Sequence, residues 1–287
     1  MRSNPRRSAQ RYGDLFEPRL AQVPDRPPHA TRTLHVLVTV KAAPNPSSQY
    51  GETVCVAGVS EDIERPGWIR LYPINFRYLE QELRFKKYDV ITVDAVPATR
   101  DTRAESWRPR MDTLRVERFL RPWKPRRPWI DPYVEDSMCR LNEAAAANPR
   151  ARSLGLVRVT EVVAFDIEPH PGWSPEEQRK IDAYVSQLEL FGGEDRTALE
   201  APRFKGFYRW RCADSGCEGH RQGVIDWEFI ALQRRLQMRS DEDATTALRH
   251  RFLDELCGPQ RALAFYVGNQ AKRPQVFSVL GVYYPPL

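Results

Sequence analysis

Five short runs of β-branched and apolar residues follow one another near the start of the chain, separated by loops and one short helical segment at 76–83. The runs are Leu34–Val40, Thr53–Val59, Gly67–Tyr72, Tyr88–Val96 and Thr113–Glu117. Five short strands and one helix within about 85 residues favour a small closed barrel over a parallel sheet. Residues 33–125 are therefore expected to form a first barrel.

The rest of the chain alternates helical and strand patterns. Strands are expected at 154–168, 204–211, 262–267 and 277–284, and helices at 129–147, 174–191, 226–237 and 241–256. We expect a helical connector at 126–152 and a second β-rich lobe with helices at 153–287. Residues 1–32 are rich in Arg and Pro and are expected to form a flexible basic arm, extended or disordered. The fold class predicted is α+β, β-rich, with two small barrels and inserted helices.

Composition excludes several classes of protein. The chain is 41% hydrophobic and 29% charged, which is enough apolar surface for a buried core. It contains no run of about 18 apolar residues that would span a membrane and no secretory signal, so a cytoplasmic protein is expected. Five cysteines in such a chain argue against a disulfide framework. The sequence motifs of nucleotide hydrolysis, dinucleotide binding and serine hydrolysis are absent.

The basic residues are mostly arginine, 37 against seven lysines, in a chain of net charge +6. Arginine binds phosphates with its forked guanidinium and stacks on bases, although a GC-rich genome also replaces lysine by arginine without any function. Residues 100–127 combine ten basic and four acidic residues with interleaved tryptophans. We expect phosphate contacts from Arg103, Arg108, Arg110, Arg126 and Arg127, and base contacts from Trp68, Tyr72 and Trp107, with Arg70 on the same strand face. The alternative is that the tryptophans are core anchors and the arginines solvated charges.

One local cluster admits two interpretations. Asp101, Arg103 and Glu105 lie close together in sequence and could form an acid–base site. Ion pairs that order a loop are the favoured interpretation, because they are the commoner role of such clusters.

A turn rich in cysteine is the sharpest candidate for a metal site. Cys212, Cys217 and His220 lie within nine residues and offer ligands that Zn²⁺ prefers. The fourth ligand is open between Cys257, His250 and a carboxylate such as Asp226. Three interpretations remain: a structural zinc site, a catalytic metal site with Glu228 as base, and a tight turn without metal.

Short motifs along the chain resemble those of a known family. They are 52–58, 67–73, 85–89, 103–109, 153–156, 211–220 with 226–228, 267–269 and 280–281. Over residues 33–285 the sequence resembles the bacterial dual OB-containing domain proteins, which are linked to defence against foreign nucleic acid. The resemblance implies two tandem OB-like barrels and a role in sensing or binding nucleic acid. It brings no catalytic residues with it.

We therefore expect a nucleic-acid-binding protein of a bacterial defence or mobile-element system, with DNA or RNA as partner and no membrane. Two alternatives stay open. One is a metal-dependent nuclease or hydrolase centred on Cys217, His220, Asp226 and Glu228. The other is a scaffold subunit that docks a catalytic effector protein from the same operon.

Overall fold

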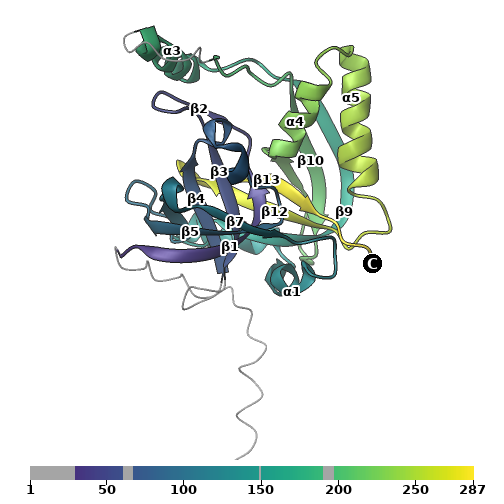
Figure 1. The fold of residues 1–287 in the computed structure, drawn as a ribbon. Coiled ribbons are helices and arrows are strands. Elements are labelled where there is room, and N and C mark those ends of the chain that lie inside the picture. The colour runs from purple at the N-terminus through teal and green to yellow at the C-terminus, as the bar shows by residue number, and fades with distance from the viewer. Residues whose placement is uncertain (1–29, 61–66, 149, 190–196) are drawn as a thin grey trace, which may run out of the picture.

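The computed structural model describes residues 30–60, 67–148, 150–189 and 197–287. The expected basic arm at 1–32 lies almost wholly outside these residues. The described chain folds into a β-rich α+β structure with two β-sheets side by side (Figure 1). This confirms the predicted fold class of two tandem small barrels.

The first sheet closes into a five-stranded barrel. The sheet as a whole has seven strands, which are β1 (Arg32–Lys41), β2 (Asn45–Ser47), β3 (Gly51–Ser60), β4 (Gly67–Ile74), β5 (Asp89–Pro97), β6 (Ser106–Pro109) and β7 (Arg115–Phe119). The order β1-β3-β4-β6-β5 returns to β1 through antiparallel pairing of β5 with β1, while β4 and β6 are parallel. Short 3₁₀ turns at Phe76–Tyr78 and Gln81–Leu83 stand where the short helix was expected.

The strand that closes this barrel differs from the one expected. β6 pairs with both β4 and β5, whereas the expected fifth strand, β7, pairs with β5 alone in the described sheet. The segment Ser-Trp-Arg-Pro of β6 is short, charged and ends in proline, so it carries little strand signal of its own.

The second sheet has six strands. They are β8 (Val134–Glu135), β9 (Leu154–Pro169), β10 (Phe204–Cys212), β11 (His220–Gly223), β12 (Ala264–Gln270) and β13 (Arg273–Tyr283), in the order β11-β10-β9-β12-β13 with β8 beside β9. An isolated parallel bridge between Val224 and Val279 brings the two edges of this half-barrel together. Counted from its first long strand, each barrel thus has the order 1-2-3-5-4 with the third and fifth strands parallel. This order is compatible with the OB fold, a five-stranded Greek-key barrel.

The α-helices follow the first barrel in the chain. They are α1 (Arg127–Ile130), α2 (Met138–Ala147), α3 (Pro175–Glu189), α4 (Trp227–Arg235) and α5 (Asp241–Arg249), which continues as a π-helical turn to Glu255. The continuous helix expected at 129–147 is wrong, since a 3₁₀ turn and β8 divide α1 from α2. In Figure 1, α4 and α5 lie over β10 and β9. Helix α3, in the long connection between β9 and β10, lies above β2.

Three apolar clusters hold the molecule together. One fills the first barrel, with Ile69 and Leu71 in it, and one fills the second, with Tyr208 and Phe265 in it. The third lies between the barrels. It joins Leu37, Val59 and Trp68 of the first barrel to Leu156, Tyr266 and Leu280 of the second. The two barrels therefore share a core, which explains why β1 and β3 carry apolar side chains on both faces.

Candidate functional site

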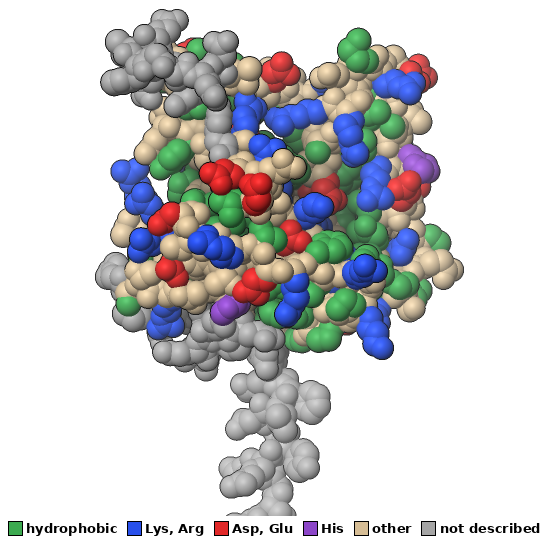
Figure 2. Space-filling view, in the orientation of Figure 1, with side chains coloured by type: hydrophobic (Ala, Val, Ile, Leu, Met, Phe, Trp, Pro, Cys, Tyr) green, Lys and Arg blue, Asp and Glu red, His purple; other side chains and the backbone are tan. Residues whose placement is uncertain are grey.

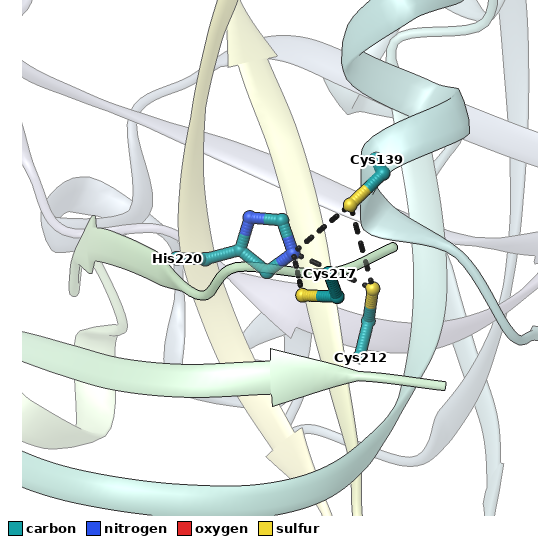
Figure 3. A group of neighbouring side chains, drawn as sticks. All are labelled: Cys139, Cys212, Cys217 and His220. Carbon is teal, nitrogen blue, oxygen red and sulfur yellow. Dashed lines mark hydrogen bonds between the residues drawn. The ribbon is translucent and has the colours of Figure 1, made fainter. Parts of the chain in front are cut away.

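Four side chains converge at the tip of the β10–β11 hairpin (Figure 3). The donor atoms of Cys139, Cys212, Cys217 and His220 all lie within 4.8 Å of one another. Nε2 of His220 lies 3.7 Å from Sγ of Cys139, 3.4 Å from Sγ of Cys212 and 3.2 Å from Sγ of Cys217. The Cys139 and Cys212 sulfurs are 3.9 Å apart. This group could hold a metal ion.

These four distances are close to those between the ligands of a tetrahedral ion. With zinc–ligand bonds of about 2.3 Å to sulfur and about 2.0 Å to nitrogen, tetrahedral angles separate two sulfurs by about 3.8 Å and a sulfur from a nitrogen by about 3.5 Å. Four protein donors fill such a site, which is the arrangement of structural rather than catalytic zinc.

The local sequence folds the turn around this point. Cys212 ends β10 and His220 begins β11, opposite Trp210. The carboxylate of Asp214 accepts from the N–H of Gly216, and its carbonyl accepts from the N–H of Cys217. Gly219 has φ +116°, a conformation that side chains with a Cβ rarely adopt. The turn thus brings Cys217 back toward the end of β10.

Helix α2 brings the fourth donor to the turn. The Ser137 hydroxyl caps the helix by accepting from the N–H of Arg140, and it donates to the Asp214 carboxylate. The N–H of Ala213 donates to the carbonyl of Asp136. These contacts fix the first turn of α2 on the hairpin, so that Cys139 points at His220.

The pKa values of the donors shift in different directions. Burial, and then the neighbouring Cys212 thiol, raise the pKa of Cys139. Burial opposes ionisation of Cys212 as well, but backbone N–H donors outweigh it and lower the pKa of that thiol. Burial lowers the pKa of His220 and keeps its ring in the neutral form that binds metals. A bound divalent ion would supply the charge that stabilises the thiolates.

The three metal ligands expected from sequence are brought together, and the fourth was missed. Cys139 is separated from Cys212 by 73 residues, so no local spacing could point to it. The candidates Cys257 and His250 lie elsewhere: the Cys257 thiol donates to the Phe252 carbonyl, and His250 pairs with Glu255.

The carboxylates of the nuclease alternative do not belong to this group of donors. Asp226 is 4% exposed and caps α4 by accepting from the N–H of Glu228. Burial raises the pKa of its carboxyl. A Cβ at Gly281 would lie 3.2 Å from its Oδ2 and 3.0 Å from Nζ of Lys87. Asp226 thus belongs to the boundary between the barrels.

The expected stacking face of the first barrel is covered. Trp68, Arg70 and Tyr72 do share the outer face of β4, but Trp68 packs on Tyr133 and Tyr266 and is 6% exposed. Trp107 is 2% exposed inside the first barrel. The prediction that bases stack on these two rings is therefore wrong. Tyr72, 41% exposed, is the one ring of the three that solvent reaches.

Arginines expected at phosphates divide into two groups. Arg70, Arg103 and Arg126 are engaged inside the protein, so the expected phosphate contact is wrong for Arg103 and Arg126. Nη2 of Arg70 donates to Ser153, Nη1 of Arg103 donates to the Asn269 carbonyl, and Nε of Arg126 donates to the Leu120 carbonyl. Arg108 and Arg110 are exposed, and the half-buried Arg127 lines an open pocket of about 580 Å³ with Trp123 and Lys124. The ion pair predicted for Asp101 and Arg103 is confirmed, at 2.6 Å.

The matching face of the second barrel is open. The outer side chains of β10 and β11 are Lys205, Phe207, Arg209, Arg211 and Arg221, which we call the open strand face. All four cations are exposed and Phe207 is half-buried, with the guanidinium of Arg221 3.9 Å from its ring centroid. Arg209 pairs with Asp166, Arg211 with Glu161 and Arg221 with Glu168 across the strands. Sequence reasoning missed this face, although the alternation of Phe204–Cys212 signals it.

Charge alone does not locate a binding surface in this protein. Figure 2 shows Lys and Arg side chains spread over both barrels on the side that it views, interspersed with Asp and Glu. Among the residues described, no helix is long and apolar enough to cross a membrane.

Comparison with known proteins found two family matches and no match among curated proteins. The domain of unknown function DUF8758 matches residues 32–132, which contain the first barrel. All four metal-site residues and the open strand face lie in the second match, which covers residues 134–287. The chain belongs to the family described as domain of unknown function DUF8757, which matches residues 134–287.

Proposed function

We propose that the protein binds single-stranded nucleic acid on the open strand face, with a structural zinc ion at the tip of the β10–β11 hairpin. The observation that carries the proposal is the contrast between the two barrels. OB barrels bind single strands on the face of their second and third strands. In the first barrel that face is packed against the second barrel, whereas in the second barrel it is exposed and cationic.

The chemistry of the open strand face suits an extended single strand. Arg209 and Arg211 are two residues apart on β10, about 6.6 Å along the strand, close to the phosphate spacing of an extended strand. Phe207 offers a ring on which a base can stack. The cross-strand carboxylates are no obstacle, because exposed ion pairs such as Arg211–Glu161 contribute at most about 1 kcal/mol. A phosphate can take the place of the carboxylate.

Zinc is the ion that the donor set favours. Three thiolates, which are soft ligands, and one imidazole form a ligand set typical of structural zinc. Bound there, the ion would fasten the hairpin tip to α2. The nuclease alternative needs an open coordination position, and the four protein donors leave none. The link to a defence system and an effector partner stays a prediction from the resemblance.

Fluorescence anisotropy with labelled single- and double-stranded DNA and RNA tests the proposal. Three or four phosphate contacts predict that affinity for the single strand falls about 20- to 50-fold between about 50 and 200 mM salt. The triple variant Arg209→Ala, Arg211→Ala, Arg221→Ala should lose most of this affinity and most of the salt dependence.

A matched control removes the same charge from the first barrel. Arg108→Ala, Arg110→Ala, Arg118→Ala also replaces three exposed arginines and should bind almost as the wild type does. If this control loses the affinity and the β10–β11 variant keeps it, the site lies on the first barrel. If the wild type binds none of the four nucleic acids even at low salt, the proposed function is wrong.

A further inference from the structure

The open strand face and the metal centre belong to the same hairpin. Arg209 and Arg211 lie on β10 and Arg221 on β11, and the turn between these strands carries Cys217. Arg209 is opposite Arg221, and Trp210 is opposite His220. Side chains alternate along the hairpin, so the outer cations and the inner donors share one backbone.

Arg211 connects the two directly. Its Nη1 donates to the carbonyl of Cys217 at 3.0 Å, and its Nε lies 3.3 Å from Glu161 on β9. The carbonyl belongs to a residue whose thiol is one of the four donors. The direction of the Arg211 guanidinium therefore depends on where the turn holds Cys217.

Cys139 is the donor that lies outside the hairpin. The other three donors sit on β10, the turn and β11, whereas Cys139 sits on α2. Helix α2 is itself packed in the second barrel through Met138 and Leu141. A metal ion that binds Cys139 thus ties the hairpin tip to a buried helix, which restrains the hairpin more than the three hairpin donors do alone.

We propose that Cys139 is a positioning residue for nucleic-acid binding: through the metal, it fixes the hairpin so that Arg211 meets a phosphate. This inference rests on the proposed function of the open strand face. It makes affinity for a single strand dependent on metal occupancy, although none of the four donors touches the nucleic acid.

The test is a double-mutant cycle in the full-length, zinc-loaded protein, measured with labelled single-stranded DNA and RNA. Arg211→Ala alone and Cys139→Ser alone should each lower affinity about tenfold, the value of one charged hydrogen bond. The two effects on affinity should not add. Without Cys139 the metal no longer ties the turn to α2, so Arg211 is no longer held in place. Cys139→His, which keeps a metal ligand, should restore both the affinity and the effect of Arg211→Ala.

Two further measurements separate positioning from a general loss of structure. Cobalt substitution should give a tetrahedral thiolate spectrum in the wild type, in Cys139→His and in the control Cys55→Ser, and an altered one in Cys139→Ser. Cys55 is a cysteine of the first barrel. Removal of zinc from the wild type with a chelator should reproduce the affinity of Cys139→Ser, and zinc should restore it.

The outcomes are distinct. Additive effects of Cys139→Ser and Arg211→Ala, or unchanged affinity in Cys139→Ser, would overturn the inference while leaving the proposed function in place. A wild type that binds zinc but no nucleic acid would overturn both. A wild type that binds nucleic acid with no zinc or cobalt bound at all would overturn the positioning role alone.

Discussion

At the scale of single residues, burial separates the arginines that hold the protein together from those that face solvent. Arg70 and Arg126 are 5% and 4% exposed, and the guanidinium of Arg126 lies 3.7 Å from the Tyr88 ring centroid. Arg103 bonds both Asp101 and Asn269, which links the loop before β6 to β12. Buried cations of this kind must find partners inside the protein, so they are not available to phosphates.

Asp101 gives a pH-dependent prediction at this scale. Burial alone would raise the pKa of Asp101, but hydrogen bonds from Arg103 and Ser106 outweigh it and lower the pKa from 3.8 to about 2. The ionised carboxylate therefore stabilises the folded state fully above pH 4, and this contribution is lost as the pH falls through 2. Asp101→Asn should cost about 1–2 kcal/mol at pH 7 in urea unfolding.

The difference in unfolding free energy between wild type and Asp101→Asn should stay constant from pH 7 to 5 and narrow below pH 4. Other carboxyl groups titrate in both proteins and cancel in this difference. A difference that is independent of pH would show that the ion pair is not the source of the stabilisation.

Single residues were predictable where chemistry is local. Spacing alone identified Cys212, Cys217 and His220, and it identified the ion pair of Asp101 with Arg103. It could not identify Cys139, whose place depends on how α2 packs. Nor could alternation along β4 show that the second barrel covers Trp68. A strand pattern tells which side chains share a face, but it does not tell what lies against that face.

At the scale of elements, the long connection between β9 and β10 is the arm of the second barrel. It carries α3 across to β2 and β3 of the first barrel, and Nη1 of Arg77 donates to Thr197 on the arm. The ring of Tyr184 packs directly on Gly51, which has φ +71°. The arm thus packs against the segment between the first two long strands, β1 and β3, of the first barrel.

Gly51→Ala should release this arm. An ideal Cβ there would lie 2.4 Å from Cε1 of Tyr184, so the ring must move, and the left-handed backbone adds a cost of about 1–2 kcal/mol. Trypsin should cleave after the exposed Arg179 and the half-buried Lys180 several-fold faster than in the wild type, as measured by gel and mass spectrometry.

Gly172→Ala is the matched control for backbone strain. Gly172 has φ +84° on the arm itself, but a Cβ there would meet no atom within 4 Å. It should share the backbone cost of Gly51→Ala without the displaced ring. Equal cleavage rates in the two variants would contradict the role assigned to Tyr184.

At the scale of the whole molecule, the two barrels form one structure with a shared core. The side chains between them include Leu37, Val59 and Trp68, and burial of each side chain of this size contributes about 1.5–3 kcal/mol. Polar contacts also fix how the barrels lie on one another. The Ser153 hydroxyl accepts from Arg70, and the Ser153 N–H donates to Glu105. The barrels can thus be identified from strand spacing, but their packing on one another is a long-range property that no local pattern contains.

Separation of the barrels tests this shared core. Residues 32–132 expressed alone should aggregate or unfold at lower urea concentration than the full chain, because the Trp68 face is exposed. Coexpression with residues 134–287 should give a soluble one-to-one complex by size-exclusion chromatography with light scattering. A monomeric first barrel with the stability of the full chain would contradict the shared core.

The proposed nucleic-acid-binding face lies on the second barrel and not on the first. Photo-cross-linking of a 5-bromouracil single strand to the full-length protein, with the adducts located by mass spectrometry, tests it most directly. We expect adducts within residues 204–223, mainly at Phe207, that disappear in the Arg209→Ala, Arg211→Ala, Arg221→Ala variant. Adducts concentrated in residues 67–127 instead would contradict it and return the site to the first barrel.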